Sequence, residues 1–181
     1  MELKEKTAFI TGGASGLGKA TAEYFIAAGA KVMLFDLSPE NAEAAAQELG
    51  EKADWSAGDV SNESDVKRAI LKTKERFGGL HININSAGIG AAARTLGRNG
   101  PMAIQQFEFV IKVNLLGTFN CLRLCAAEMK DNEQQSEDGE KGVIINVASV
   151  AAFDGQIGQA AYSASKAGVA GMTLPIARDL G

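Results

Sequence analysis

Short apolar segments alternate with longer helical segments along this chain, and few folds accommodate that alternation. Five apolar segments have the length of buried strands, namely residues 6–11, 31–36, 54–57, 80–85 and 142–149. The helical segments are residues 16–28, 40–49, a segment capped by Ser61 or Asn62 that ends at Phe77, and residues 104–130 and 160–180. Strands joined by helices at this spacing run parallel, with right-handed crossovers that place helices on both faces. The sequence therefore predicts one α/β domain over residues 1–181, with a doubly wound, Rossmann-like parallel sheet.

Glycine, proline and charge mark several boundaries of these elements. Gly29 and Gly50 follow the first two helical segments, where a glycine commonly ends a helix. Pro39 suits the first turn of the second helix, because its missing N–H needs no partner there. Residues 131–141 are almost entirely polar or charged, so we expect a solvated loop between a helix and a strand.

The composition is that of a soluble globular protein, with 46% hydrophobic and 22% charged residues. The net charge of −4 argues against nucleic acid or an anionic membrane as a partner. No continuous apolar run approaches the roughly 18 residues of a membrane span, and the first residues resemble neither a signal nor a transit peptide. We therefore expect a cytoplasmic protein that acts on a small molecule.

The two cysteines and the single histidine give little support to a metal site. Cys121 and Cys125 lie one helical turn apart and are interpreted as small apolar residues on a buried face. A second cysteine pair is absent from the sequence, so no metal site is expected. His81 begins an apolar strand, which favours a solvated or edge position over a catalytic role.

A glycine-rich loop joins the first strand to the first helix. Glycine allows positive φ angles and lets backbone N–H groups approach a phosphate, while the helix N-terminus adds unpaired donors. This context after a strand and before a helix predicts a dinucleotide-binding loop. Its expected cofactor-binding residues are Gly12, Ser15, Gly16, Leu17 and Gly18.

Asp36, at the end of the second strand, distinguishes between the two nicotinamide dinucleotides. A carboxylate there can accept hydrogen bonds from the adenosine ribose hydroxyls. A 2′-phosphate would instead meet like charge, costing about 4 kcal/mol for unit charges roughly 4 Å apart at an effective dielectric of about 20. The neighbours Phe35, Leu37 and Ser38 carry no compensating cation. We therefore predict NAD rather than NADP.

Tyr162, Lys166 and Ser149 form a candidate proton-transfer group. Residues four apart share one face of a helix, so Tyr162 and Lys166 are expected to face the same site. A phenol is a poor base at neutral pH, and a neighbouring ammonium favours its phenolate form. Ser149 is predicted at the carboxyl end of the fifth strand, where it can hold the reacting oxygen of the substrate beside Tyr162.

These motifs, in this order, resemble those of the classical short-chain dehydrogenase/reductase family. The resemblance implies that Asp59 and Val60 contact adenine and that Asn85, Ser86, Ala87 and Gly88 lie under the cofactor. It also implies a catalytic tetrad of Asn114, Ser149, Tyr162 and Lys166. In that tetrad, Tyr162 and Lys166 also bind the cofactor, with Lys166 holding the nicotinamide ribose, and Asn114 supports a proton-relay water through a strained backbone.

A narrower resemblance, over residues 113–120, 142–166 and 171–180, is to type 2 short-chain 3-hydroxyacyl-CoA dehydrogenases, which also oxidise some hydroxysteroids. It implies an acyl-CoA substrate and places Gln156 near it. Pro175 belongs to this match, although proline inside a helix loses a hydrogen bond and clashes with the carbonyl of Gly171. The family further implies a homo-oligomer, a dimer or tetramer, often built from helices 104–130 and 160–180.

Family members of roughly 250 residues carry two further strands, substrate-covering helices and a loop that contacts nicotinamide. We therefore expect this sequence to be truncated at the C-terminus, with residues 143–147 as an apolar edge strand. We expect the complete parent enzyme to be active and the 181-residue chain alone to show weak turnover or none.

Two alternatives stay open. One is a 3-oxoacyl-carrier-protein reductase, which normally uses NADPH and is therefore disfavoured by Asp36. The other is a non-catalytic NAD-binding module.

Overall fold

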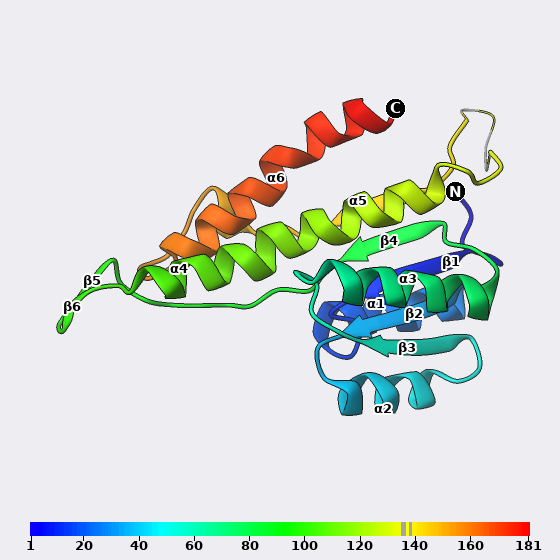
Figure 1. Ribbon diagram of the computed structural model, residues 1–181, viewed down its shortest axis with the longest axis horizontal. Coiled ribbons are helices and arrows are strands. Elements are labelled where there is room, and N and C mark those ends of the chain that lie inside the picture. The colour runs from blue at the N-terminus through cyan, green and yellow to red at the C-terminus, as the bar shows by residue number, and fades with distance from the viewer. Residues whose placement is uncertain (135–136, 138) are drawn as a thin grey trace.

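Five parallel strands form the central sheet in the order β3-β2-β1-β4-β7. The computed structural model (Figure 1) describes residues 1–134, 137 and 139–181. The strands are β1 (Thr7–Thr11), β2 (Lys31–Asp36), β3 (Ala53–Ala57), β4 (Ile82–Asn85) and β7 (Val143–Asn146). The doubly wound parallel sheet predicted from the sequence is therefore confirmed.

Helices cover both faces of this sheet. They are α1 (Gly16–Ala27), α2 (Pro39–Leu49), α3 (Glu63–Phe77), α4 (Ile104–Ile111), α5 (Gly117–Met129) and α6 (Ala160–Leu180), with a π-helical turn η1 (Lys112–Leu116) and a 3-10 turn η2 (Val150–Ala152). The Asn62 side chain caps α3, and Ser38 caps α2 ahead of Pro39. Both caps satisfy N–H groups that a helix start leaves unpaired.

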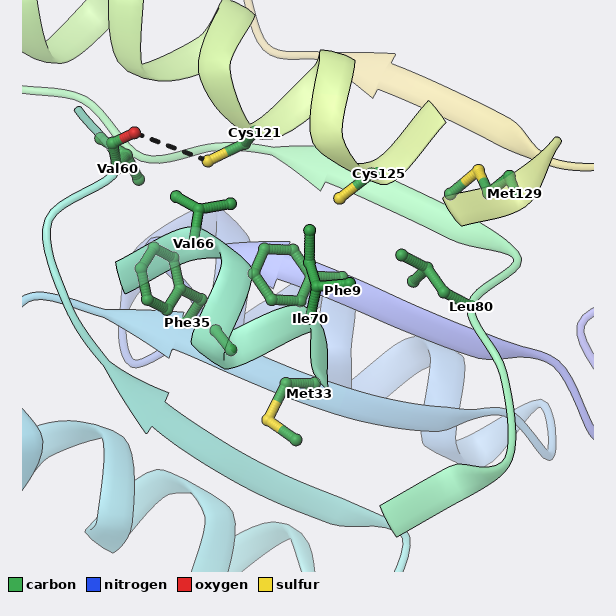
Figure 2. Close-up of a cluster of buried hydrophobic side chains, with 11 residues drawn as sticks. Phe9, Met33, Phe35, Val60, Val66, Ile70, Leu80, Cys121, Cys125 and Met129 are labelled. Carbon is green, nitrogen blue, oxygen red and sulfur yellow. Dashed lines mark hydrogen bonds between the residues drawn. The ribbon is translucent and has the colours of Figure 1, made fainter. Parts of the chain in front are cut away.

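Alternation along the strands creates one hydrophobic core on each face. Ala8, Ile10, Val32 and Leu34 point towards α1 and α2. Their neighbours point the other way, where Phe9, Met33 and Phe35 pack with α3 and α5 (Figure 2). The Phe9 and Phe35 rings stack with centroids 5.5 Å apart. Burying a large apolar side chain of this kind stabilises the fold by about 1.5–3 kcal/mol.

Cys121 and Cys125 lie in the second of these cores, as expected from their spacing. Both are fully buried on α5, and Figure 2 shows them facing Val66 and Ile70 of α3. Burial raises the pKa of the Cys121 thiol to about 12 and raises that of Cys125 as well. The thiols therefore stay protonated at neutral pH and act as apolar packing residues.

The helical run Ile104–Met129 is long and apolar enough to cross a membrane by length and composition alone, with a mean hydropathy of 1.3. Its buried residues include Val110, Cys121, Cys125 and Met129, which pack in the protein core. The run is interrupted by η1, which the sequence-based prediction of one long helix did not contain.

Other elements also differ from the prediction. The fifth strand ends at Asn146 rather than Ser149. A two-stranded hairpin of β5 (Leu96–Gly97) and β6 (Gly100–Pro101) was not expected at all. Residues 135, 136 and 138, inside the predicted solvated loop, lie outside the described residues. Helix α6 continues through Pro175, whose position is exposed.

Strand β7 is at the end of the sheet within the described residues, and Ile145 on it is 46% exposed. Exposed apolar residues also follow along α4, η1, α5 and α6, including Phe109, Leu116, Phe119 and Leu174.

His81 pairs with the start of β1 and makes the sheet sensitive to acid. The backbone N–H of Thr7 donates to His81 Nδ1 at 3.2 Å, which requires that nitrogen to be unprotonated. Burial, together with the positive charges of Lys6 and Lys31, lowers the pKa of His81. Because the folded pKa lies below the unfolded one, stability is greatest above about pH 6.5 and falls as the pH drops below it.

We expect the wild type to lose stability between pH 7.5 and pH 5 relative to His81→Asn, whose amide oxygen accepts the same bond without titrating. Since the imidazole is partly exposed, the difference should be less than about 1.4 kcal/mol, the equivalent of one pKa unit. Urea unfolding at several pH values measures it. Parallel pH curves for the two proteins would contradict the assignment.

Candidate active site

The carboxyl ends of β1, β2, β3 and β4 converge on a cavity of about 400 Å³. Eleven predicted cofactor-binding residues line it: Gly12, Ser15, Gly16, Leu17, Gly18, Asp36, Asp59, Val60, Ser86, Ala87 and Gly88. Two larger hollows, of about 520 and 570 Å³, lie against the C-terminal end of α5 and the outer face of α4, and contain none of the predicted site residues. Parallel sheets bind ligands at their carboxyl edge, so the 400 Å³ cavity is the candidate site.

The glycine loop lies against the β4 loop with no room for side chains at two positions. Gly12 has a φ of +63°, and a Cβ added there would lie 2.9 Å from the Cα of Ala87. A Cβ on Gly18 would lie only 2.2 Å from the carbonyl oxygen of Gly12. The loop therefore presents bare backbone to the cavity at the start of α1, where Ser15 makes no side-chain capping bond to any described residue. An anionic pyrophosphate fits such a cradle.

Asp36 is held in place at one side of the cavity. Its Oδ2 accepts from the N–H of Ala14 at 3.0 Å, and its Oδ1 accepts from the N–H of Ser38 at 3.3 Å. Both donors are backbone N–H groups, and no ion pair with a cationic side chain joins this carboxylate among the described residues.

Asp59 and Val60 line the cavity beside Asp36, in the turn between β3 and α3. Asp59 Oδ1 accepts from the N–H and the hydroxyl of Ser61, both at 2.8 Å. The carbonyl of Val60 accepts from Asn120 Nδ2 at 2.8 Å, which ties this turn to α5.

Residues 85–88, which begin with the last residue of β4, lie partly at the cavity and partly over the sheet. Ser86 donates from its hydroxyl to the Thr11 carbonyl at 2.6 Å, and the N–H of Ala87 donates to Thr11 Oγ1 at 3.1 Å. Asn85 is not among the residues that line the cavity, and its place under the cofactor stays a prediction. Because it is the last strand residue, its side chain lies over the sheet and donates to Asn83 at 2.7 Å and to Asn146 at 2.9 Å.

Asn114 lies in the π-helical turn and is completely buried. Its side chain accepts from the N–H of Ile89 at 2.8 Å and donates to the Ile89 carbonyl at 3.0 Å. It also donates to Ser165 Oγ at 3.1 Å. The extra residue of a π-helical turn changes which side chains face inward, and such turns often occur at functional sites.

Tyr162 and Lys166 occupy the same face of the first turns of α6, as predicted. The Lys166 ammonium lies 5.9 Å from the centroid of the Tyr162 ring and donates to the Val147 carbonyl at 2.7 Å. Burial lowers the pKa of Lys166. A Cβ built on Gly88 would lie 3.2 Å from Asn114 Oδ1 and 3.6 Å from Lys166 Nζ, so both side chains reach the rim of the cavity.

Ser149 follows the end of β7 by three residues instead of ending the strand. Its Oγ accepts from the N–H of Ala151 at 3.1 Å and caps the turn η2. The hydroxyl proton is then free to donate, because the captured N–H uses a lone pair of the oxygen. Gln156 lies in the exposed loop between η2 and α6, and its role at the substrate stays a prediction.

Two residues that the sequence analysis did not single out connect this group. Ser165 Oγ donates to the Tyr162 carbonyl at 2.7 Å and receives the amide of Asn114. The Val147 carbonyl holds Lys166. The two serines between Tyr162 and Lys166, Ser163 and Ser165, were visible in the sequence, whereas a backbone carbonyl leaves no signal there.

Comparison with known proteins agrees with this geometry. A family model described as short chain dehydrogenase matches residues 6–181. The chain belongs to the short-chain dehydrogenase family. This short-chain dehydrogenase is therefore an oxidoreductase of a family whose members use nicotinamide cofactors, and the resemblance found in its motifs is confirmed.

Curated relatives extend the match along almost the whole chain. The 3-hydroxyacyl-CoA dehydrogenase type-2 proteins of Bos taurus and Drosophila melanogaster are each 51% identical to this short-chain dehydrogenase over 180 residues. These alignments cover 98% of this chain and 69% and 70% of the relatives, respectively. The crystal structure of 3-hydroxyacyl-CoA dehydrogenase type-2 from Mycobacterium avium superposes with a TM-score of 0.92 at 39% identity, over 99% of this chain and 71% of that one.

Proposed function

We propose that this short-chain dehydrogenase interconverts 3-hydroxyacyl-CoA and 3-ketoacyl-CoA with NAD as its cofactor. The observation that carries the proposal is the meeting of Lys166 and Asn114 at Gly88, on the rim of a cavity that also contains Asp36. The names of the similar proteins support the acyl-CoA substrate.

The chain's own residues supply the proton transfer. In the reduction, the Tyr162 hydroxyl gives its proton to the substrate oxygen, and Ser149 donates a hydrogen bond to that oxygen and orients it. In the oxidation, the Tyr162 phenolate accepts the alcohol proton. The Lys166 ammonium, held by Val147, favours that phenolate electrostatically. Bound nicotinamide supplies or accepts the hydride at the substrate carbon.

Asn114 acts at the end of this proton path. Its side chain is fully engaged with Ile89 and Ser165, so it fixes the loop after β4 against the start of α6. We propose that it thereby supports a relay between Lys166 and solvent.

Asp36 supports NAD over NADP. Its carboxylate is oriented by two backbone N–H groups and lies beside the glycine loop. It can accept the ribose hydroxyls and repels a 2′-phosphate. The same carboxylate disfavours the 3-oxoacyl-carrier-protein reductase alternative, whose usual cofactor is NADPH. The complete Tyr162, Lys166 and Asn114 group disfavours a module that only binds NAD.

The test is reduction of acetoacetyl-CoA with NADH or NADPH, together with titration of both cofactors. We expect wild-type protein to bind NADH at least about tenfold more tightly than NADPH, and Asp36→Asn to narrow that preference by about tenfold. Asparagine keeps an oxygen acceptor for Ala14 but lacks the charge. Asp154→Asn is the matched control, since Asp154 is exposed and does not line the cavity. A wild-type preference for NADPH would overturn the cofactor assignment.

We also propose a homo-oligomer whose contacts involve α4, α5 and α6. The exposed apolar residues along these helices support it, since a soluble chain seldom leaves such a set uncovered.

A further inference from the structure

The loops at the carboxyl edge of the sheet differ sharply in charge. They are residues 12–15, 37–38, 58–62, 86–103 and 147–159. Of these loops, all within the described residues, only residues 86–103 contain arginine or lysine, namely Arg94 and Arg98. That loop has no acidic residue, whereas the loops after β3 and β7 carry Asp59 and Asp154. The edge that binds ligands therefore has one cationic segment in a protein of net charge −4.

Both arginines are exposed and uncommitted within the described part of the chain. Neither guanidinium has a hydrogen bond or an ion pair with a described residue, and both side chains belong to exposed residues. Arg68 and Arg123, by contrast, bind Asp65 and Glu63. Lys19, on the first turns of α1, is paired with Glu48 at 2.7 Å. Arg94 and Arg98 are thus the exposed cations that the loops of this edge offer to an anionic ligand.

Arg94 and Arg98 lie on the β5–β6 hairpin, which is anchored next to α6, the helix that carries Tyr162 and Lys166. The N–H of Met102 donates to the Thr95 carbonyl at 3.0 Å, extending the β5–β6 pairing. At the base, the N–H of Ala93 donates to the carbonyl of Gly158, two residues before α6, at 2.9 Å. Figure 1 shows the hairpin projecting outward beyond the start of α4. Its base is therefore fixed to the segment that leads into Tyr162.

An apolar cavity of about 410 Å³ lies between the base of the hairpin and α6. Ala93 and Met102 line it from the hairpin side, and Ala161, the neighbour of Tyr162, lines it from α6. Phe109 and Ile89 line both this cavity and the dinucleotide cavity. The apolar cavity therefore adjoins the dinucleotide cavity on one side and the base of the arginine-bearing hairpin on the other.

We propose that Arg94 and Arg98 bind the phosphate groups of the CoA portion of the substrate, while the apolar cavity takes the chain that links them to the thioester. This inference rests on the proposed function, because it identifies how the same site recognises an acyl-CoA. CoA ends in a pyrophosphate and a 3′-phosphate, and a guanidinium can bind two phosphate oxygens at once. Without these cations, the net negative charge of the protein would oppose the approach of such a substrate.

The test compares two thioesters of the same acyl group, acetoacetyl-CoA and acetoacetyl-N-acetylcysteamine, which lacks phosphates. For the double variant Arg94→Gln/Arg98→Gln, we expect KM for acetoacetyl-CoA to rise about five- to thirtyfold, as two exposed ion pairs suggest. We expect the KM for acetoacetyl-N-acetylcysteamine to stay unchanged. At high salt, the difference in KM for acetoacetyl-CoA between the wild type and the double variant should disappear. Arg94→Lys/Arg98→Lys should retain part of the affinity. Arg178→Gln, an exposed arginine near the far end of α6, is the matched control.

Direct titration with free CoA gives a readout that needs no turnover. We expect the double variant to weaken CoA binding by the same factor and to leave NADH binding within about twofold. Equal CoA affinity in wild type and variant would overturn the inference, even with acetoacetyl-CoA reduced normally. If the double variant lost activity only with an acyl carrier protein substrate, the inference would also be overturned, and the arginines would instead bind an acidic protein. If neither thioester is reduced while CoA binding still depends on the arginines, the proposed reaction fails and the CoA site stands.

Discussion

Tyr162→Phe is expected to lower kcat for acetoacetyl-CoA reduction by at least about 100-fold, the usual contribution of a positioned acid or base. Phenylalanine fills the same space but has no hydroxyl proton to exchange with the substrate oxygen. The affinity for NADH should stay within about threefold of the wild type, because the glycine loop and Asp36 are unchanged. Steady-state kinetics and a fluorescence titration of NADH measure the two effects.

Tyr24→Phe is the matched control for this change. Tyr24 is the other tyrosine of the chain and is 70% exposed on α1. Its replacement should leave kcat and the free energy of unfolding close to the wild type. Full activity in Tyr162→Phe would remove the proton-transfer role proposed for the group formed with Lys166, Ser149 and Asn114.

Gly18→Ala is expected to have the largest effect on cofactor binding. The new Cβ would lie 2.2 Å from the Gly12 carbonyl oxygen and 2.7 Å from Ser86 Oγ. Because the first neighbour is backbone, either α1 or the glycine loop has to move, and the cradle for the pyrophosphate moves with it. Overpacking of this kind costs about 1–3 kcal/mol of stability. We expect NADH binding to weaken by at least about tenfold, which corresponds to about 1.4 kcal/mol.

Gly171→Ala controls for the general cost of replacing a helical glycine. No heavy atom lies within 4 Å of the Cβ that would be added there on α6. That substitution should be neutral or stabilise the protein by about 0.5–1 kcal/mol, since alanine favours helix. Urea unfolding and NADH titration separate the two variants. Equal NADH affinity in Gly18→Ala and wild type would contradict the assignment of the glycine loop.

Much of the fold could be predicted because the relevant signals are local. The period of the apolar residues distinguishes strands 31–36 from helices such as 160–180, and both ranges agree with β2 and α6. The loop Gly12–Gly18 and Asp36 end up on one cavity because parallel strands expose their carboxyl ends at one edge. Tyr162 and Lys166 share a face because helical periodicity requires it.

The sequence did not reveal the local geometry at positions where contacts with distant parts of the chain decide it. The sequence did not show that the Asn85 amide donates to Asn83 and to Asn146, a partner 61 residues away on a neighbouring strand. The π-helical turn at Asn114 interrupts a segment whose apolar pattern predicts one continuous helix. Ser149 lies in a turn that packs against α6, so the strand stops earlier than its apolar pattern suggests.

The amino-acid pattern was sufficient for the layer order, the dinucleotide loop and the tyrosine–lysine pair, because each depends on neighbouring residues and on the two backbone periodicities. Long-range contacts were required to place Lys166 on the Val147 carbonyl, to turn Asn85 onto the sheet, and to anchor the arginine hairpin at Gly158. The physical reason is that these contacts join backbone groups and side chains from separate elements. Their partners become neighbours in space after the sheet and helices have packed.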